Sequence, residues 1–153
     1  MTLTPSETYD LQFLSVEEDW SYDPSEPTTP CAHLDLLKGK PYASVGIALL
    51  PIRHSWEAFA LLNWGGWNAC PLPEENCAAF RYWGERYSAK IISITHDIVE
   101  CTVERLPKDP EEALELAEEQ YAYCTDLVDQ GTGTIENLAA SLLVSYTWFF
   151  WWD

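Results

Sequence analysis

The chain has 153 residues, of which 47% are hydrophobic and 14% aromatic, and its formal net charge at pH 7 is −17. This length and composition fit one domain with a sizeable core and exclude a disordered or collagen-like chain. The charge disfavours nucleic acids and anionic membranes as partners, because both would be repelled. The longest nearly apolar run, residues 142–152, is shorter than the roughly 20 residues that span a bilayer.

The five cysteines are scattered, and no C-x-x-C pair is present. Their number is odd, and no positively charged start followed by an apolar run precedes them, so we expect reduced thiols in a cytoplasmic protein. The histidines His33, His54 and His96 lie in separate segments without an H-x-x-x-H spacing. We therefore predict no metal site and no cofactor.

The charges are unevenly distributed along the chain. Residues 1–37 hold eight acids and no base, residues 38–108 hold seven acids and all eight bases, and residues 109–153 hold ten acids and no base. Two acidic ends around a nearly neutral middle favour a basic protein partner. The alternative is that the acids serve only solubility.

The N-terminal part, residues 1–40, is interpreted as an acidic segment with a proline-rich connector at 23–30, and residues 41–153 as one domain. Residues 9–16 could form a short element of undecided type. The continuous apolar run Ala43–Ile52 predicts a first core strand that is buried on both faces. The segment after Ser55 is either a short helix or a second extended piece.

A helix is predicted over Pro73–Tyr87, with proline at its first position and Phe80, Trp83 and Tyr87 on one stripe. Two strands, residues 90–95 and 98–103, flank a turn at His96 and Asp97. In the second strand Val99, Cys101 and Val103 alternate with Ile98, Glu100 and Thr102, which predicts a hairpin with one apolar face.

A second long helix is predicted from Asp109, the expected N-cap, to about Cys124. Leu114, Ala117 and Tyr121 should face the core. A turn-rich loop, residues 126–133, precedes a helix capped by Thr134, and Ser145–Trp152 is predicted to be a central or well-covered strand. This order of elements suits an α+β fold, a ferredoxin-like two-layer sandwich with helices on one face of a mainly antiparallel four-stranded sheet.

The stretch Asn63–Pro73, NWGGWNACPLP, lies between these regular segments. Gly65 and Gly66 permit a positive φ or a close backbone approach, and the prolines fix the exit, so we interpret the stretch as an ordered loop.

Six blocks of the sequence occur in a characteristic order: GGWNACP at 65–71, RYWGERY at 81–87, THDIVE at 95–100, EEALELAEEQYAYC at 111–124, DLVDQGTGT at 126–134 and WFFWWD at 148–153. Together they resemble the bacterial family known as domain of unknown function 4253, over about Val45 to Asp153. The resemblance implies a compact cytoplasmic domain but no activity, substrate or catalytic residue. Leu72 departs from the small polar N-cap expected in the family.

Two kinds of catalytic site can be weighed. Cys70 with His54 or His96 has the residue types of a thiol nucleophile, but no local signature accompanies it. Carboxylates are the better enzyme candidate: they could bind Mg²⁺ or act as acid and base in a hydrolase that works with or without a metal ion. These candidates are Asp97, Glu100, Asp126 and Asp129. Their alternative roles are turns and caps for the aspartates and an exposed strand face for Glu100.

The favoured interpretation is a non-enzymatic protein-binding domain, an immunity or inhibitor protein that neutralises a basic toxin or nuclease. Its candidate anchors are Trp64, Trp67 and Asn68, residue types typical of binding hot spots, although the tryptophans could pack in the core and Asn68 could tie its own loop. The acids predicted on the solvent face of the second long helix complete the candidate surface: Glu111, Glu115, Glu118 and Glu119. Two further functions stay open, the carboxylate hydrolase and a structural subunit that self-associates through an apolar patch near the C-terminal strand.

Overall fold

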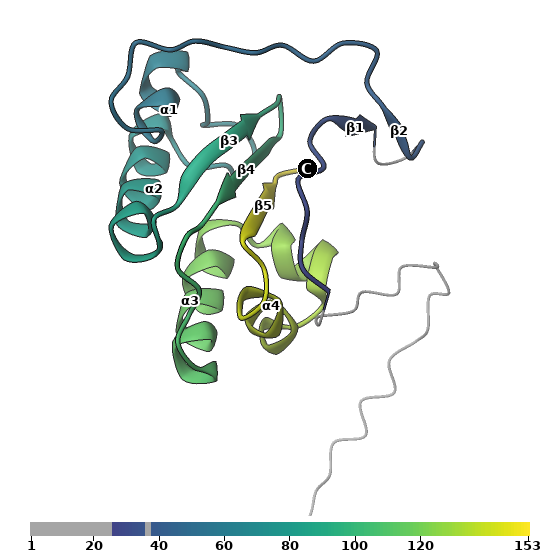
Figure 1. The fold of residues 1–153 in the computed structure, drawn as a ribbon, viewed down its shortest axis with the longest axis vertical. Helices are drawn as coiled ribbons and strands as arrows, with labels where there is room; N and C mark the ends of the chain where they lie inside the picture. The colour runs from purple at the N-terminus through teal and green to yellow at the C-terminus, as the bar shows by residue number, and fades with distance from the viewer. Residues whose placement is uncertain (1–25, 36–37) are drawn as a thin grey trace, which may run out of the picture.

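The computed structural model describes residues 26–35 and 38–153 (Figure 1). Its strands are β1 (Leu34–Asp35), β2 (Lys40–Pro41), β3 (Lys90–Ile94), β4 (Ile98–Thr102) and β5 (Thr147–Trp151). Its helices are α1 (Glu57–Leu62), α2 (Pro73–Tyr87), α3 (Pro110–Tyr123) and α4 (Ile135–Leu142), together with the π-helix η1 (Leu127–Thr132). The fold is therefore α+β, as predicted.

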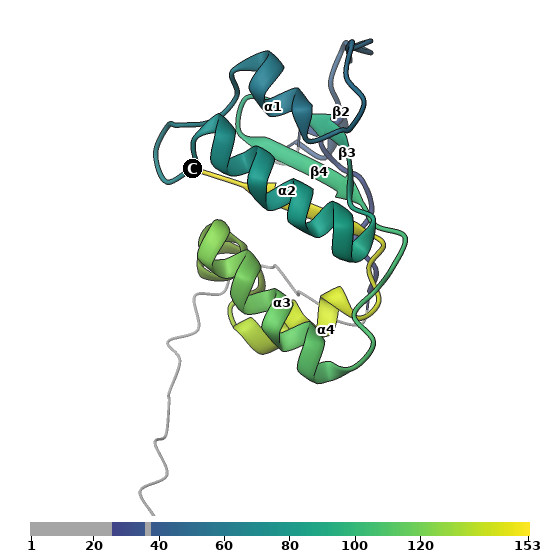
Figure 2. The same ribbon diagram turned by 90° about the vertical axis from the view of Figure 1, so that its left-hand side faces the viewer.

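The main sheet is antiparallel, with the strand order β3-β4-β5, and β1 and β2 form a separate small hairpin. A ferredoxin-like sheet needs a fourth strand, and the main sheet of the described residues has three. Figure 2 shows α2 lying along the sheet, with α3 and α4 below it. The region predicted over residues 9–16 lies outside the described residues.

The missing strand is the main error of the predicted fold. Residues 43–52 form no regular element, and Val45, Ile47 and Leu49 are 65%, 95% and 95% exposed. They arch from β2 to α1 past the end of the sheet (Figure 1). An apolar run indicates a tendency toward burial but does not specify the surface that buries it. Here aromatic side chains of α2, α3 and β5 already fill the helix-covered face of the sheet.

Helix α2 has the predicted bounds, and its stripe of Phe80, Trp83 and Tyr87 is buried as expected. Leu72 offers no capping oxygen, but its own backbone N–H donates to Glu75 Oε2 at 2.8 Å, so half of a capping box remains. The departure from the family pattern is thus partly offset. On the sheet, Trp83 stacks on Phe150 at a ring separation of 5.4 Å, which joins α2 to β5.

Strand β5 lies at an edge of the sheet and is well covered, because Trp148, Phe150 and Trp152 are each at most 2% exposed. The predicted hairpin of β3 and β4 is present, with Val99 opposite Ile94 and Cys101 opposite Ile91. Burial is not confined to one face of β4, however. Ile98 and Glu100 on the other face are also buried.

Helix α3 begins as predicted, since Asp109 Oδ1 accepts from the backbone N–H of Glu112 at 2.9 Å. Its buried face is rotated from the expected one: Leu114 is 38% exposed, whereas Leu116 is 1% exposed. The rotation follows from packing, because Leu116 enters the shared core and Leu114 does not. The loop predicted after α3 is instead the π-helix η1, and Thr134 caps α4 by accepting from Asn137 N at 3.1 Å.

The N-terminal arm, defined here as residues 26–35, crosses the sheet face that the helices leave open (Figure 1). Thr28 N–H donates to Ser145 Oγ at 2.9 Å, and Ala32 is 5% exposed. The arm therefore packs on the domain that was predicted to begin after it. None of the described helices is long and apolar enough to cross a membrane.

Candidate functional site

The loop between α1 and α2 is held by its glycines. Gly65 has φ of 120°, and a Cβ there would lie 2.3 Å from the carbonyl oxygen of Pro71 and 2.5 Å from Asn76 Nδ2. Only glycine fits such a close approach. Asn76, fully buried on α2, donates from Nδ2 to Pro71 O at 2.9 Å and accepts from Tyr123 OH. The loop is thus ordered by a side-chain network from α2 and α3.

The predicted anchors of this loop are held in different ways. The Trp64 indole donates to Thr95 O at 2.8 Å and packs beside Phe59, so Trp64 belongs largely to the core. Trp67 lies edge-on to Trp64 and 5.9 Å from the ring of His96, with part of its surface exposed. Asn68 Nδ2 donates to the backbone oxygen of Asp153 at 2.6 Å. The amide of Asn68 therefore ties the loop to the C-terminal residue.

The acidic surface of α3 is narrower than predicted. Glu111, Glu115 and Glu118 are exposed, and no ion pair joins them to the described part of the chain. We call these three residues the acidic face of α3. Their i, i+4 and i+7 spacing places them along one side of the helix.

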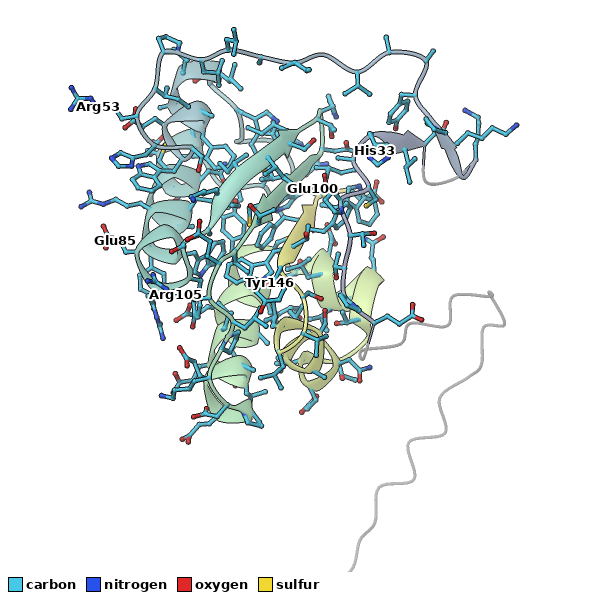
Figure 3. All side chains as sticks on the ribbon, viewed as in Figure 1. His33, Arg53, Glu85, Glu100, Arg105 and Tyr146 are labelled. Atoms are coloured by element: carbon cyan, nitrogen blue, oxygen red, sulfur yellow. The ribbon has the colours of Figure 1, made fainter. Side chains whose placement is uncertain are left out.

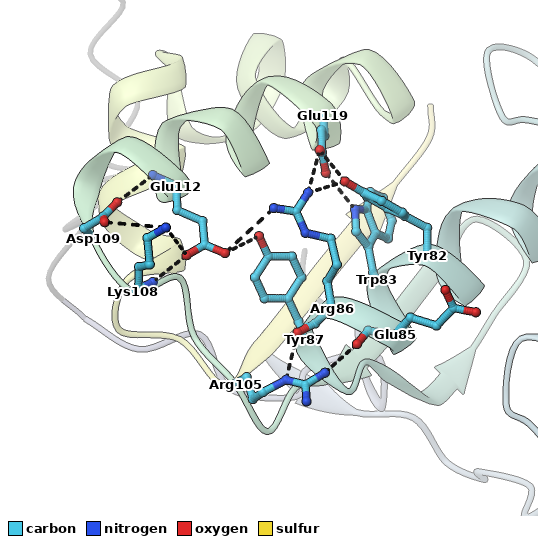
Figure 4. A network of polar contacts seen from close by, with 10 residues as sticks. All are labelled: Tyr82, Trp83, Glu85, Arg86, Tyr87, Arg105, Lys108, Asp109, Glu112 and Glu119. Atoms are coloured by element: carbon cyan, nitrogen blue, oxygen red, sulfur yellow. Dashed lines mark hydrogen bonds and ion pairs between the residues drawn. The ribbon is translucent and has the colours of Figure 1, made fainter.

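Glu119 does not face open water as expected. It accepts from Tyr82 OH at 2.9 Å and Trp83 Nε1 at 3.3 Å, and its ion pair with Arg86 measures 3.2 Å (Figure 4). The rotation of α3 that buries Leu116 turns Glu119 toward α2. Sequence spacing alone could not find this contact, because it depends on how two helices face each other.

Arg86 connects the two helices at a second point. It lies 3.8 Å from Glu112, which also accepts from Tyr87 OH at 3.2 Å (Figure 4). The capping-box side chain of Glu112 reaches the backbone N–H of Lys108 at 3.0 Å, one residue before the N-cap. Burial raises the pKa of Tyr87 to about 12, and the charge of Glu112 also raises it. Arg86 and Tyr87 of α2 and Glu112 and Glu119 of α3 thus hold the two helices together, and we call these four residues the α2–α3 clamp.

The four candidate catalytic carboxylates contact different parts of the chain. Asp97 and Asp126 both lie near the C-terminal residues: Asp97 O accepts from Trp152 N at 3.2 Å, and Asp126 Oδ2 accepts from Asp153 N at 3.2 Å. Asp129 instead accepts from Tyr121 OH at 3.2 Å. Glu100 lies on the sheet beneath the N-terminal arm (Figure 3). In the described part of the chain, no three His, Cys, Asp or Glu side chains are placed to hold a metal ion.

Glu100 is 2% exposed, which overturns its interpretation as part of an exposed strand face. Its Oε1 accepts from the backbone N–H groups of Cys31 at 2.5 Å and Ala32 at 2.9 Å. Such charge-assisted bonds satisfy a buried carboxylate without a cation. Alternation in the sequence could not reveal this role, because the arm that covers Glu100 lies about 70 residues away along the chain.

Burial disfavours ionisation of the Cys31, Cys70 and Cys124 thiols. Burial, followed by the nearby charge of Glu100, raises the pKa of Cys31 to about 12. Burial likewise raises the pKa of Cys70, and it raises that of Cys124 to about 11. A thiol must ionise to attack. The predicted partner His54 is stacked on Trp56, with ring centroids 4.2 Å apart.

A shallow depression of about 510 Å³ lies beside the loop, between the start of α2 and the end of α3, and Asn68, Cys70, Glu75 and Tyr123 are among its lining residues. The carboxylate of Glu75 already accepts from Leu72 N–H. None of the four predicted catalytic carboxylates is among the described residues that line this depression. The predicted catalytic carboxylates therefore do not meet in this depression.

Comparison with known proteins gives one match. The family model described as domain of unknown function (DUF4253) matches residues 46–153. The chain belongs to this family. The DUF4253 domain thus includes the ordered loop, the acidic face of α3 and the second half of the exposed 43–52 segment, whereas the N-terminal arm precedes it. No curated protein and no solved structure matches the chain.

Proposed function

We propose that this DUF4253 protein is a non-catalytic protein-binding domain that inhibits a basic protein, such as a toxin or nuclease, by binding it through the acidic face of α3. The observation that carries the proposal is the placement of charge. Glu111, Glu115 and Glu118 project from one side of a helix and have no ion-pair partner among the described residues.

The bases of the same region are already engaged. Arg86 bridges Glu112 and Glu119, Lys108 lies 4.0 Å from both Asp109 and Glu112, and Arg105 donates to the backbone oxygens of Glu85 and Arg86. The acidic face therefore keeps an uncompensated field. Such a field speeds association with a basic surface and selects against acidic partners.

The dispersion of the carboxylates favours binding over hydrolysis. A hydrolase needs its acid and base within reach of one reacting group. Here Glu100 is covered by the arm and Asp129 is bonded to Tyr121. The partly exposed Trp67, beside His96, offers an aromatic anchor for a second contact.

The test is capture of the partner from host lysate on the tagged protein, followed by affinity measurements with the purified partner. The test variant replaces Glu111, Glu115 and Glu118 by Gln. Exposed pairs contribute about 0.2–1 kcal/mol each, so we expect the loss of all three to lower affinity by about threefold to a hundredfold. Affinity of the unchanged protein should also fall steeply with salt.

The matched control replaces the exposed acids Glu26, Glu74 and Glu136 by Gln, which changes the net charge equally at other sites. The control should retain nearly full affinity. Equal losses in both variants would show that net charge alone attracts the partner. Binding that is insensitive to salt and to the α3 substitutions would refute the proposed interface, and turnover of a substrate would refute the non-catalytic assignment.

A further inference from the structure

The most exposed apolar side chains of the described chain lie between β2 and α1. Ile47 and Leu49 are each 95% exposed and Val45 is 65% exposed, values reached by no other large apolar residue that the structure describes. The DUF4253 match begins at residue 46, so Ile47 and Leu49 belong to the family domain. Three large apolar side chains exposed to water within five residues mark an interaction surface.

The pattern of the segment is that of a β-strand. Val45, Ile47 and Leu49 alternate with the small residues of the other face, Ser44, Gly46 and Ala48. With the described residues, the backbone of residues 43–50 makes one backbone–backbone hydrogen bond: the carbonyl oxygen of Leu50 accepts from the N–H of Ile52 at 2.9 Å. The backbone groups of this segment are therefore open for pairing with another strand.

The main sheet offers an edge to receive it. Strand β3 pairs only with β4 among the described strands, and β5 at the opposite edge is flanked by the N-terminal arm through the Thr28–Ser145 contact. Beside β3, Ser55 Oγ accepts from Ile91 N–H at 3.1 Å, and from there the chain leaves the sheet and arches past its end (Figure 1). Ile92 in the middle of β3 is 47% exposed.

Charge indicates what kind of partner fits. Residues 36–56 contain no acid and include Lys38, Lys40 and Arg53, whereas the chain as a whole carries −17. This basic-flanked strand is attracted to a chain of strongly negative net charge, which a second copy provides. Two copies of the segment paired with each other about residues 46 and 47 would place Lys40 opposite Arg53. The one base of β3, Lys90, is instead already paired with Glu104, so the sheet edge is the better acceptor.

We propose that two copies of this protein form a dimer in which residues 43–50 of each copy add a strand to the outer edge of β3 in the other. The exchange buries Val45, Ile47 and Leu49 and pairs the open edge of β3. It gives a closed, two-fold symmetric contact. It also leaves the acidic face of α3 free, since that helix lies at the other end of the molecule in Figure 1.

The test is the molar mass of the full chain by light scattering after size exclusion, over a wide range of concentration. We expect a dimer. Ile47→Asp and Leu49→Asp should convert it to monomer without unfolding it, because both side chains are 95% exposed. Of Ala48→Pro and Leu49→Pro, made singly, at least one should do the same, because consecutive N–H groups face opposite edges of a strand and one of the two prolines removes an N–H needed for pairing.

Tyr146→Asp is the matched control. Tyr146 is 57% exposed and lies away from the segment, just before β5 (Figure 3). The control should remain dimeric.

The proposal is overturned by a monomer at every concentration, by a dimer that survives Ile47→Asp and Leu49→Asp, or by equal dissociation of the control. A dimer that survives both Ala48→Pro and Leu49→Pro, each made singly, refutes strand pairing, because one of the two must remove an N–H that pairs. If the protein is a monomer and the amides of residues 44–50 exchange slowly with solvent, the segment pairs with β3 of its own chain, and the dimer is refuted.

Discussion

A single buried carboxylate connects parts of the chain that are distant in sequence. Glu100 lies on the central strand of the main sheet, and two consecutive backbone N–H groups of the N-terminal arm donate to it. A buried acid without such donors would be costly, and buried amides without an acceptor would be costly as well. Each group thus makes the burial of the other possible, and Glu100 holds the arm together with Ser145, which accepts from Thr28 N–H.

Replacing Glu100 by Gln should loosen the arm. The substitution removes the charge from two hydrogen bonds and places a new N–H₂ donor in a buried site, so we expect unfolding free energy to fall by about 1.5–3 kcal/mol. Chemical denaturation measures this loss, and limited proteolysis should cleave residues 26–35 sooner. Glu104→Gln is the control, because its ion pair with Lys90 is exposed and contributes little to stability. Equal stability of the two variants would contradict the assigned role of Glu100.

At the scale of the element, the sides of helix α3 have different roles. Its cap at Asp109 starts it, Leu116 and Ala117 bury one side, and Glu112 and Glu119 connect it to Arg86 on α2. Only the remaining side carries the acidic face proposed for binding. The orientation of α3 is therefore set by packing and by the α2–α3 clamp, and that orientation decides which glutamates a partner can reach.

Loss of the cap should destabilise α3. Asp109→Ala leaves the N–H of Glu112 without its side-chain acceptor and is expected to cost about 1 kcal/mol in unfolding free energy. Thermal or chemical denaturation followed by circular dichroism measures it. Glu118→Ala provides the comparison, since Glu118 is exposed within the same helix and alanine favours helix formation. A neutral result for Asp109→Ala would mean that the end of α3 is held by packing alone.

For the whole molecule, several groups keep their protons because they are buried. The pKa values of Cys31 and Tyr87 are raised to about 12, and that of Cys124 to about 11. Their ordinary values are 9.0 for the thiols and 10.0 for the tyrosine. Above the ordinary values the unfolded chain loses these protons before the folded chain does. The folded state then binds more protons, so stability must fall as pH rises.

We therefore predict a decline in unfolding free energy that begins near pH 9 and continues toward the raised pKa values. Denaturation at a series of pH values measures the slope. Cys124→Ser removes one of the titrating thiols and should flatten the slope between 9.0 and about 11. A slope that is unchanged in this variant would show that Cys124 ionises equally in both states.

The sequence by itself determined the elements whose signals are local. It predicted α2, the β3–β4 hairpin and the caps of α3 and α4, because proline positions, capping side chains and alternating strands act over a few residues. It also predicted the family to which residues 46–153 belong.

Only the tertiary structure decided what lies against what. It buried Glu100 beneath an arm from far along the chain, turned Glu119 from solvent toward Arg86, and left Ile47 and Leu49 exposed. It also bonded the candidate catalytic acids Asp126 and Asp129 to partners within the chain. Apolarity and charge are properties of a residue, whereas burial and pairing are properties of two surfaces. The second surface is specified by packing between distant segments, which no local pattern encodes.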